Sequence, residues 1–164
     1  MKLIRFGEAG HEEPGVLLPD GRRIDASGEF LDYDEGFFAS GGLEAPAEWV
    51  ADGCVGGHEI DPSIRLGPPV ARSSKIVCIG KNYLDHAKEL GDGIPVEPAI
   101  FIKATSAWSG PFDDVIIPRG STKLDNEVEL AMEMHPPRYL QAGDFVECGV
   151  EGLGELAQRV VALR

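Results

Sequence analysis

The sequence predicts a mainly β fold with one or two short helices. Glycine (21 residues) and proline (12 residues) are abundant in this chain of 164 residues, which favours short strands joined by turns over a helical bundle. Apolar residues recur in short alternating or continuous runs, the pattern of strands that are buried on one or both faces. The length is enough for one ordinary domain, or for one domain with a small module attached.

The N-terminal part, residues 1–69, is predicted to be a small β-rich domain. Residues 1–6 alternate as a strand does, and Pro19-Asp20-Gly21 forms a turn between two further strands, because proline fixes φ and glycine tolerates a positive φ. Residues 43–50 suit a short helix with a proline in its first turn. Residues 53–69 contain two adjacent glycines and three prolines, so we interpret them as a linker and place a domain boundary near residue 69.

The C-terminal part, residues 70–164, is predicted to be the larger domain and to carry the chemistry. Strands are expected in the ranges 75–80, 98–103, 114–118, 127–132 and 145–150, and a helix in the range 82–90. Cys78 lies in the first of these apolar runs, where we expect a buried and inert thiol.

The acidic net charge of the chain argues against a nucleic-acid partner and is compatible with a metalloenzyme. A net charge of −13 argues against nucleic-acid binding, which depends on basic side chains at the phosphates. It is compatible with a metalloenzyme, because carboxylates are the preferred ligands of Mg²⁺ or Mn²⁺. Three cysteines without metal-binding spacing indicate a reducing compartment. No run approaches the length of a signal peptide or a membrane span, so we expect a cytoplasmic protein without a membrane partner.

His86 and Glu89 form the first candidate site. They are three residues apart in the predicted helix, and so lie on one face of it. A carboxylate beside an imidazole raises the pKa of the imidazole and orients it, as a general base requires. The alternative is an ordinary pair on a solvated helix face.

Glu127 and Glu129 form the second candidate site. Residues two apart in a strand point to the same side, and two neighbouring carboxylates repel each other unless a cation compensates. Ligands that are all oxygen indicate Mg²⁺, Mn²⁺ or Ca²⁺ rather than zinc. The alternative is a strand with one solvated face. Two carboxylates are also fewer ligands than such an ion usually takes from a protein.

The two candidate pairs belong to an ordered set of motifs along the chain. They are Ile79-Gly80-Lys81-Asn82-Tyr83-Leu84-Asp85-His86 with Glu89, Glu97-Pro98 with Phe101 and Lys103, Gly110-Pro111, Ile117-Pro118, and Glu127 and Glu129 with Leu130. Taken together and in this order, the motifs closely resemble the fumarylacetoacetate hydrolase family. Residues 136–154 resemble the C-terminal end of that family. The resemblance covers roughly residues 1–132 and 135–164.

The resemblance implies a fold, a metal and a reaction. The fold would be a mixed β-sandwich roll with a small N-terminal β domain, usually a homodimer. His86 and Glu89 would activate water, Glu127 and Glu129 would bind Mg²⁺ (or Mn²⁺ or Ca²⁺), and Lys81 and Asn82 would bind the substrate. The substrate would be a small β-diketo or 2-oxo acid, whose carbon–carbon bond is hydrolysed. Isomerisation of hydroxymuconate-type dienes, decarboxylation of oxaloacetate-like acids and ureidoglycolate lyase activity are the alternatives within the family.

The sequence departs from the family pattern at residues 132–136. A long central segment should follow Leu130 and carry a third metal ligand, a catalytic lysine and a substrate loop, but the chain passes directly to the C-terminal motifs. We therefore expect a truncated roll with exposed apolar edges. Three hypotheses remain: an enzyme of this family seen incompletely, an inactive internal-deletion remnant that only dimerises, and a small-molecule-binding β-domain without catalysis.

Overall fold

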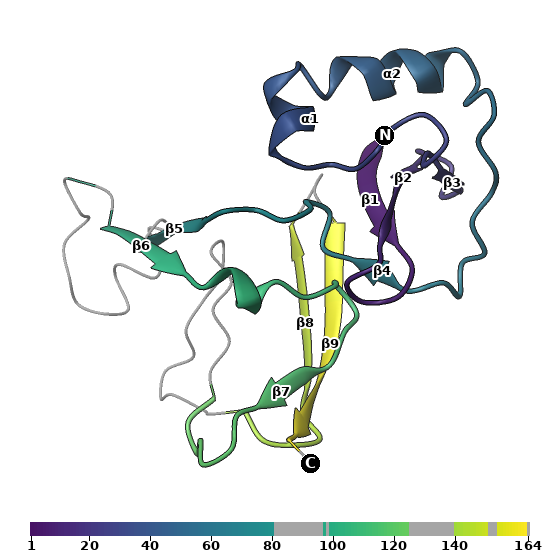
Figure 1. Cartoon of the computed structure of the whole chain (residues 1–164). Coiled ribbons are helices and arrows are strands. Elements are labelled where there is room, and N and C mark those ends of the chain that lie inside the picture. The colour runs from purple at the N-terminus through teal and green to yellow at the C-terminus, as the bar shows by residue number, and fades with distance from the viewer. Residues whose placement is uncertain (81–96, 98, 125–139, 151–153, 164) are drawn as a thin grey trace. The chain divides into compact units, whose positions relative to one another are not determined.

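The computed structural model describes residues 1–80, 97, 99–124, 140–150 and 154–163 (Figure 1). The chain divides into two compact units, which are described separately. Unit 1 comprises Met1–Ser74 and Trp108–Pro111, and unit 2 comprises Lys75–Ala107 and Phe112–Arg164. Most elements in the described ranges are strands, which confirms the mainly β class. Among these same residues, no helix is long and apolar enough to cross a membrane.

Unit 1 is built on one antiparallel sheet with the strand order β3-β2-β1-β4. Its strands are β1 (Lys2–Phe6), β2 (Glu13–Leu17), β3 (Arg23–Asp25) and β4 (Leu66–Gly67). The predicted turn between β2 and β3 is present: the amide of Gly21 donates to the carbonyl oxygen of Leu18 at 3.0 Å. Gly21 has φ +90°, a conformation that glycine adopts without steric cost.

Two short helices, α1 (Glu35–Ala39) and α2 (Glu44–Ala51), complete unit 1. The helix predicted for residues 43–50 is confirmed as α2. Its Trp49 packs with Val16, Ile24 and Ala26 in the core of the unit. The indole Nε1 of Trp49 donates to the carbonyl oxygen of Val55 at 3.0 Å, so this aromatic side chain buries its ring without leaving its polar atom unpaired.

The prediction of a linker at residues 53–69 is wrong, because much of this segment is bound to the sheet. Glu59 forms an antiparallel bridge with Ile24, and Ile60 is buried. β4 then pairs with the end of β1 through Leu66 opposite Phe6. Glycines and prolines do not prevent these contacts; they supply the turns that return the chain to the sheet. The boundary near residue 69 stays a prediction.

The described residues of unit 2 form two separate groups of strands. β5 (Ile76–Gly80) pairs antiparallel with β6 (Ala99–Lys103), and the short 3-10 helix Thr105–Ala107 follows. β7 (Val115–Ile117) pairs parallel with β9 (Gly154–Ala162), which pairs antiparallel with β8 (Phe145–Val150). The predicted strands at 75–80, 98–103, 114–118 and 145–150 are therefore present. The predicted helix 82–90 and strand 127–132 lie outside the described residues.

The β5–β6 pair buries only one of its two faces. Cys78 is 4% exposed, which confirms the predicted buried thiol, whereas Val77 is 57% exposed. Val77 lies opposite Ile102, which is 68% exposed. A continuous apolar run therefore does not make β5 a strand buried on both sides. The roll and its truncation, which the resemblance implies, stay predictions.

Candidate active site

The first predicted site segment leaves and rejoins one end of the β5–β6 pair. Lys81, Asn82, His86 and Glu89 all belong to the connection of residues 81–98. Its two flanking residues, Gly80 and Ala99, are partners in the antiparallel register. All four predicted site residues lie outside the described residues, so their roles as water-activating dyad and substrate-binding groups stay predictions.

The second predicted site segment also begins and ends beside two residues that pair with each other. Glu127 and Glu129 belong to the connection of residues 125–139. Leu124 and Leu140 at its two ends form an antiparallel bridge, in which the amide of Leu140 donates to the carbonyl oxygen of Leu124 at 2.7 Å. Both glutamates lie outside the described residues. The structure thus shows which paired residues stand at the two ends of each connection, while the metal-ligand role of the glutamates stays a prediction.

Several other residues of the motifs are described. The Nζ of Lys103 lies 5.6 Å from the ring centroid of Phe101, a distance at which a cation is attracted to an aromatic face. β7 ends at Ile117, and the carbonyl oxygen of Pro118 accepts a hydrogen bond of 3.1 Å from the amide of Ser121. Phe101 and Lys103 thus belong to strand β6, and Pro118 belongs to a turn after β7.

The metal ion that the chain is predicted to bind follows from the chemistry of its predicted ligands. Across the described ranges, no three or more His, Cys, Asp or Glu side chains are grouped so that they could hold a metal ion. The predicted ligands Glu127 and Glu129 supply only carboxylate oxygens, which suit Mg²⁺ or Mn²⁺.

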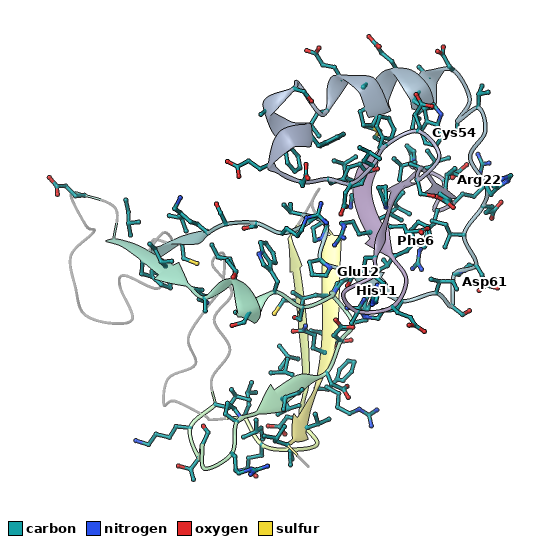
Figure 2. The ribbon with its side chains drawn as sticks, viewed as in Figure 1. Phe6, His11, Glu12, Arg22, Cys54 and Asp61 are labelled. Carbon is teal, nitrogen blue, oxygen red and sulfur yellow. The ribbon has the colours of Figure 1, made fainter. Side chains whose placement is uncertain are left out.

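Unit 1 contains a buried ion-pair cluster, which consists of Arg5, Glu12, Asp32 and Arg65. The Nε of Arg5 lies 2.7 Å from Oδ1 of Asp32, and its Nη1 lies 3.6 Å from Oε2 of Glu12. Arg65 adds a second guanidinium at 2.9 Å from Oε1 of Glu12. In Figure 2, Glu12 lies in the loop between β1 and β2, whereas Arg22 lies at the turn before β3.

Electrostatics in this cluster favour the charged form of Glu12. Burial alone would raise the pKa of Glu12, but the hydrogen bond from Arg65 and the charge of Arg5 outweigh it and lower that pKa below its ordinary value of 4.5. The Glu12 carboxylate is matched by two guanidinium groups and is not poised to accept a proton near neutral pH. We interpret the cluster as structural. Sequence reasoning missed it because its partners lie 27 and 53 residues apart.

Comparisons with known proteins connect the chain to one family. Residues 75–135 match the family model described as fumarylacetoacetate (FAA) hydrolase C-terminal. The chain is 41% identical over 133 residues to the 2,4-didehydro-3-deoxy-L-rhamnonate hydrolase of Sphingomonas sp. strain SKA58, which covers 80% of this chain and 44% of that protein. It is 38% identical over 145 residues to a protein of Burkholderia multivorans provisionally named a hydrolase, which covers 84% of this chain and 48% of that protein.

These matches cover only part of this chain and only part of each relative. The resemblance to the family that the motifs predicted is confirmed. The chain spans about half the length of the curated relatives it matches. The family match ends at residue 135, inside the range 132–136 where the sequence departs from the family pattern.

Proposed function

The chain is related to the fumarylacetoacetate hydrolase family through residues 75–135, and from this premise we propose that it works as a divalent-metal-dependent hydrolase of β-diketo or 2-oxo acids. One observation carries the proposal: a single matched stretch contains all six predicted site residues. Both segments that hold these residues start and end at paired positions, Gly80 with Ala99 and Leu124 with Leu140. This supports two connections whose ends are fixed by paired residues, as a catalytic site carried on loops requires.

The proposed reaction assigns a proton transfer to His86. The imidazole takes a proton from water, while Glu89 orients the ring and stabilises its charged form. The oxygen of the water attacks a carbonyl carbon of the substrate, and the bond from this carbon to the adjacent CH₂ breaks. The bonding electron pair stays on that CH₂ carbon, which takes up a proton. An acylpyruvate would thus yield pyruvate and a carboxylic acid.

The metal and the remaining residues position the substrate in this proposal. Glu127 and Glu129 would hold Mg²⁺ or Mn²⁺, which as a Lewis acid supplies stabilisation of negative charge when bound. Lys81 follows directly on β5 and would offer its ammonium group to the carboxylate of the oxo acid. Asn82 would offer an amide donor beside it.

The substrate class follows from the named relative. The Sphingomonas protein is named for a 2,4-didehydro-3-deoxy sugar acid, which is a diketo acid. We propose an acid of this class for this chain, ahead of a hydroxymuconate, oxaloacetate or ureidoglycolate substrate. A homodimer and a cytoplasmic location belong to the same proposal. The exposed apolar side chains of β5 and β6 support self-association, and sedimentation velocity tests it.

The test is release of pyruvate from 2,4-didehydro-3-deoxy-L-rhamnonate and from acetylpyruvate, with MgCl₂ or MnCl₂. The intact mass is measured first against the 17.6 kDa of this sequence. His86→Ala is expected to lower kcat roughly 10²- to 10⁴-fold. Glu147→Gln is the matched control, because Glu147 is an exposed carboxylate on β8 and should leave the rate unchanged. Equal rates in wild type and His86→Ala would contradict the assignment of His86.

A second candidate function is a dimerising remnant without catalysis. It is favoured by the end of the family match at residue 135 and by coverage of only about half of each relative. A protein of 17.6 kDa that releases no pyruvate with either metal would support this candidate and reject the hydrolase. Ligand binding that survives His86→Ala in an inactive protein would instead indicate a binding domain.

A further inference from the structure

The chain leaves unit 1 through two residues that are bound to it in different ways. Ala71 is 1% exposed, and its amide donates to the carbonyl oxygen of Tyr33 at 2.9 Å. Arg72 follows directly, with Nη2 at 3.1 Å from Oδ2 of Asp34 and Nη1 at 3.5 Å from Oδ2 of Asp32. The first segment of unit 1 ends shortly after, at Ser74.

The backbone of Arg72 gives an independent sign that this position is held. Its φ is +46°, in the left-handed region that a residue with a Cβ atom rarely occupies. Such a conformation persists where the surrounding structure fixes it. Here the buried Ala71 on one side and the two ion pairs of the Arg72 side chain supply that fixation.

The segment that receives Ala71 and Arg72 is itself tied to the core of unit 1. Asp32 pairs with the buried Arg5 at 2.7 Å. Tyr33 is fully buried, and its hydroxyl donates to the carbonyl oxygen of Gly15 in β2 at 3.0 Å. Asp34 caps α1 by accepting a hydrogen bond from the amide of Phe37 at 3.1 Å. Residues 32–34 therefore present a rigid docking point.

We propose that Ala71 and Arg72 form a salt-sensitive clamp that fixes the point at which the chain leaves unit 1. β5 begins at Ile76, four residues after Arg72, and a chain of that length spans at most about 14 Å. The clamp thus sets the origin of the short stretch that leads to β5. The Arg72 side chain is 71% exposed, so dissolved salt screens its ion pairs. This inference does not rest on the proposed function.

Native-state hydrogen exchange of the complete 164-residue chain tests the clamp at the amide of Ala71. Asp34→Asn is the sharpest variant, because asparagine still caps α1 but carries no charge to pair with Arg72. Asp34→Asn and Arg72→Ala are each expected to raise the exchange rate of this amide on the order of three- to tenfold. The double variant should add little to either one. In wild type, 1 M NaCl should have a similar effect, and in Asp34→Asn it should have little.

Two controls separate the clamp from a general loss of stability. The amide of Ala26, which donates to the carbonyl oxygen of Pro14 at 3.0 Å, reports on the sheet and should keep its rate in every variant. Arg22→Ala removes an exposed ion pair with Asp20 elsewhere in unit 1 and should change neither amide. The proposal is overturned if Asp34→Asn and salt leave the Ala71 rate unchanged, or if Ala71 and Ala26 accelerate together.

Discussion

Arg5 is a charged side chain that the sheet of unit 1 buries together with its partners. The side chains of Arg5, Glu12 and Asp32 are 9%, 7% and 10% exposed. Arg5→Met keeps an unbranched apolar side chain in place of the aliphatic part of arginine but leaves the two carboxylates without their shared guanidinium. We expect the free energy of unfolding to fall by roughly 3–5 kcal/mol, as when one partner of a buried pair is removed. Urea unfolding followed by tryptophan fluorescence measures this, since Trp49 and Trp108 both belong to unit 1.

The control for this prediction is Arg22→Ala, which removes an ion pair of similar length in a different environment. Arg22 and Asp20 lie 2.8 Å apart but are 54% and 53% exposed, so solvent screens their attraction and Arg22→Ala should lower stability far less than Arg5→Met. Equal losses in Arg5→Met and Arg22→Ala would show that the burial of Arg5 does not matter, and would contradict the structural role given to the cluster.

The lowered pKa of Glu12 predicts a dependence of stability on pH. The carboxylate has a pKa of 4.5 when unperturbed, and in the folded protein the net effect of burial, Arg65 and Arg5 lowers it. Because the folded state then holds the proton less tightly than the unfolded state, this stabilisation is present above pH 4.5. It is lost as the pH falls from 4.5 through the folded pKa.

Glu12→Gln tests this dependence, because glutamine cannot titrate. The difference in unfolding free energy between wild type and Glu12→Gln should be constant from pH 7 to about pH 5. It should then shrink as the pH falls below 4.5. Urea unfolding at a series of pH values measures it. A difference that stays constant down to pH 3 would show that the pKa of Glu12 is not lowered by folding.

At the scale of elements, the sequence predicted the strands, the turn and the helix that depend on residues close together in the chain. The turn at Pro19-Asp20-Gly21, the helix α2 and the strands β1, β5, β6, β7 and β8 follow from alternation, apolar runs and turn residues. β9 was not predicted, because its burial depends on pairing with β7 and β8, from a distant and a neighbouring part of the chain. The linker interpretation of residues 53–69 failed for the same reason: composition does not show that β4 pairs with β1.

Gly57 tests whether this supposed linker is packed against the sheet. A Cβ atom at Gly57 would lie 2.7 Å from Cγ2 of Ile24 and 2.9 Å from Cη2 of Trp49, so Gly57→Ala should destabilise unit 1 by about 1–3 kcal/mol. Gly28→Ala is the matched control, with nothing within 4 Å of the new Cβ, and should be neutral within about 0.5 kcal/mol. Thermal unfolding compares the two. Equal stability in both variants would restore the linker interpretation.

At the scale of the whole molecule, the candidate site came from residue order rather than from local spacing. His86 with Glu89, or Glu127 with Glu129, is a common pair on a solvated surface, and either pair alone leaves function open. Their order along the chain, together with Lys103 and Ile117-Pro118, predicted a family that the match over residues 75–135 confirms. Residue types do not determine whether the two pairs come together in the folded chain, because that depends on how connections far apart in sequence fold.

Magnesium binding tests whether Glu127 and Glu129 form half of a metal site. Two carboxylates alone should bind Mg²⁺ weakly, and an ion at ten times its Kd stabilises a folded protein by about 1.4 kcal/mol. That corresponds to a rise in Tm of roughly 3–6 °C for a chain of this size. We therefore expect 10 mM MgCl₂ to raise the Tm of the wild type by a few degrees. Glu127→Gln combined with Glu129→Gln should abolish the rise, and Glu147→Gln should preserve it.

The size of the shift also bears on the length of the protein. If the intact mass is 17.6 kDa, these two glutamates are the predicted ligands, and the shift at 10 mM Mg²⁺ should stay at a few degrees. If the purified protein is longer, additional ligands should make the shift larger at the same Mg²⁺ concentration, because a third carboxylate tightens binding of the ion. A shift that survives in the double variant would place the ion elsewhere in the chain, and the two glutamates would then be an ordinary solvated pair.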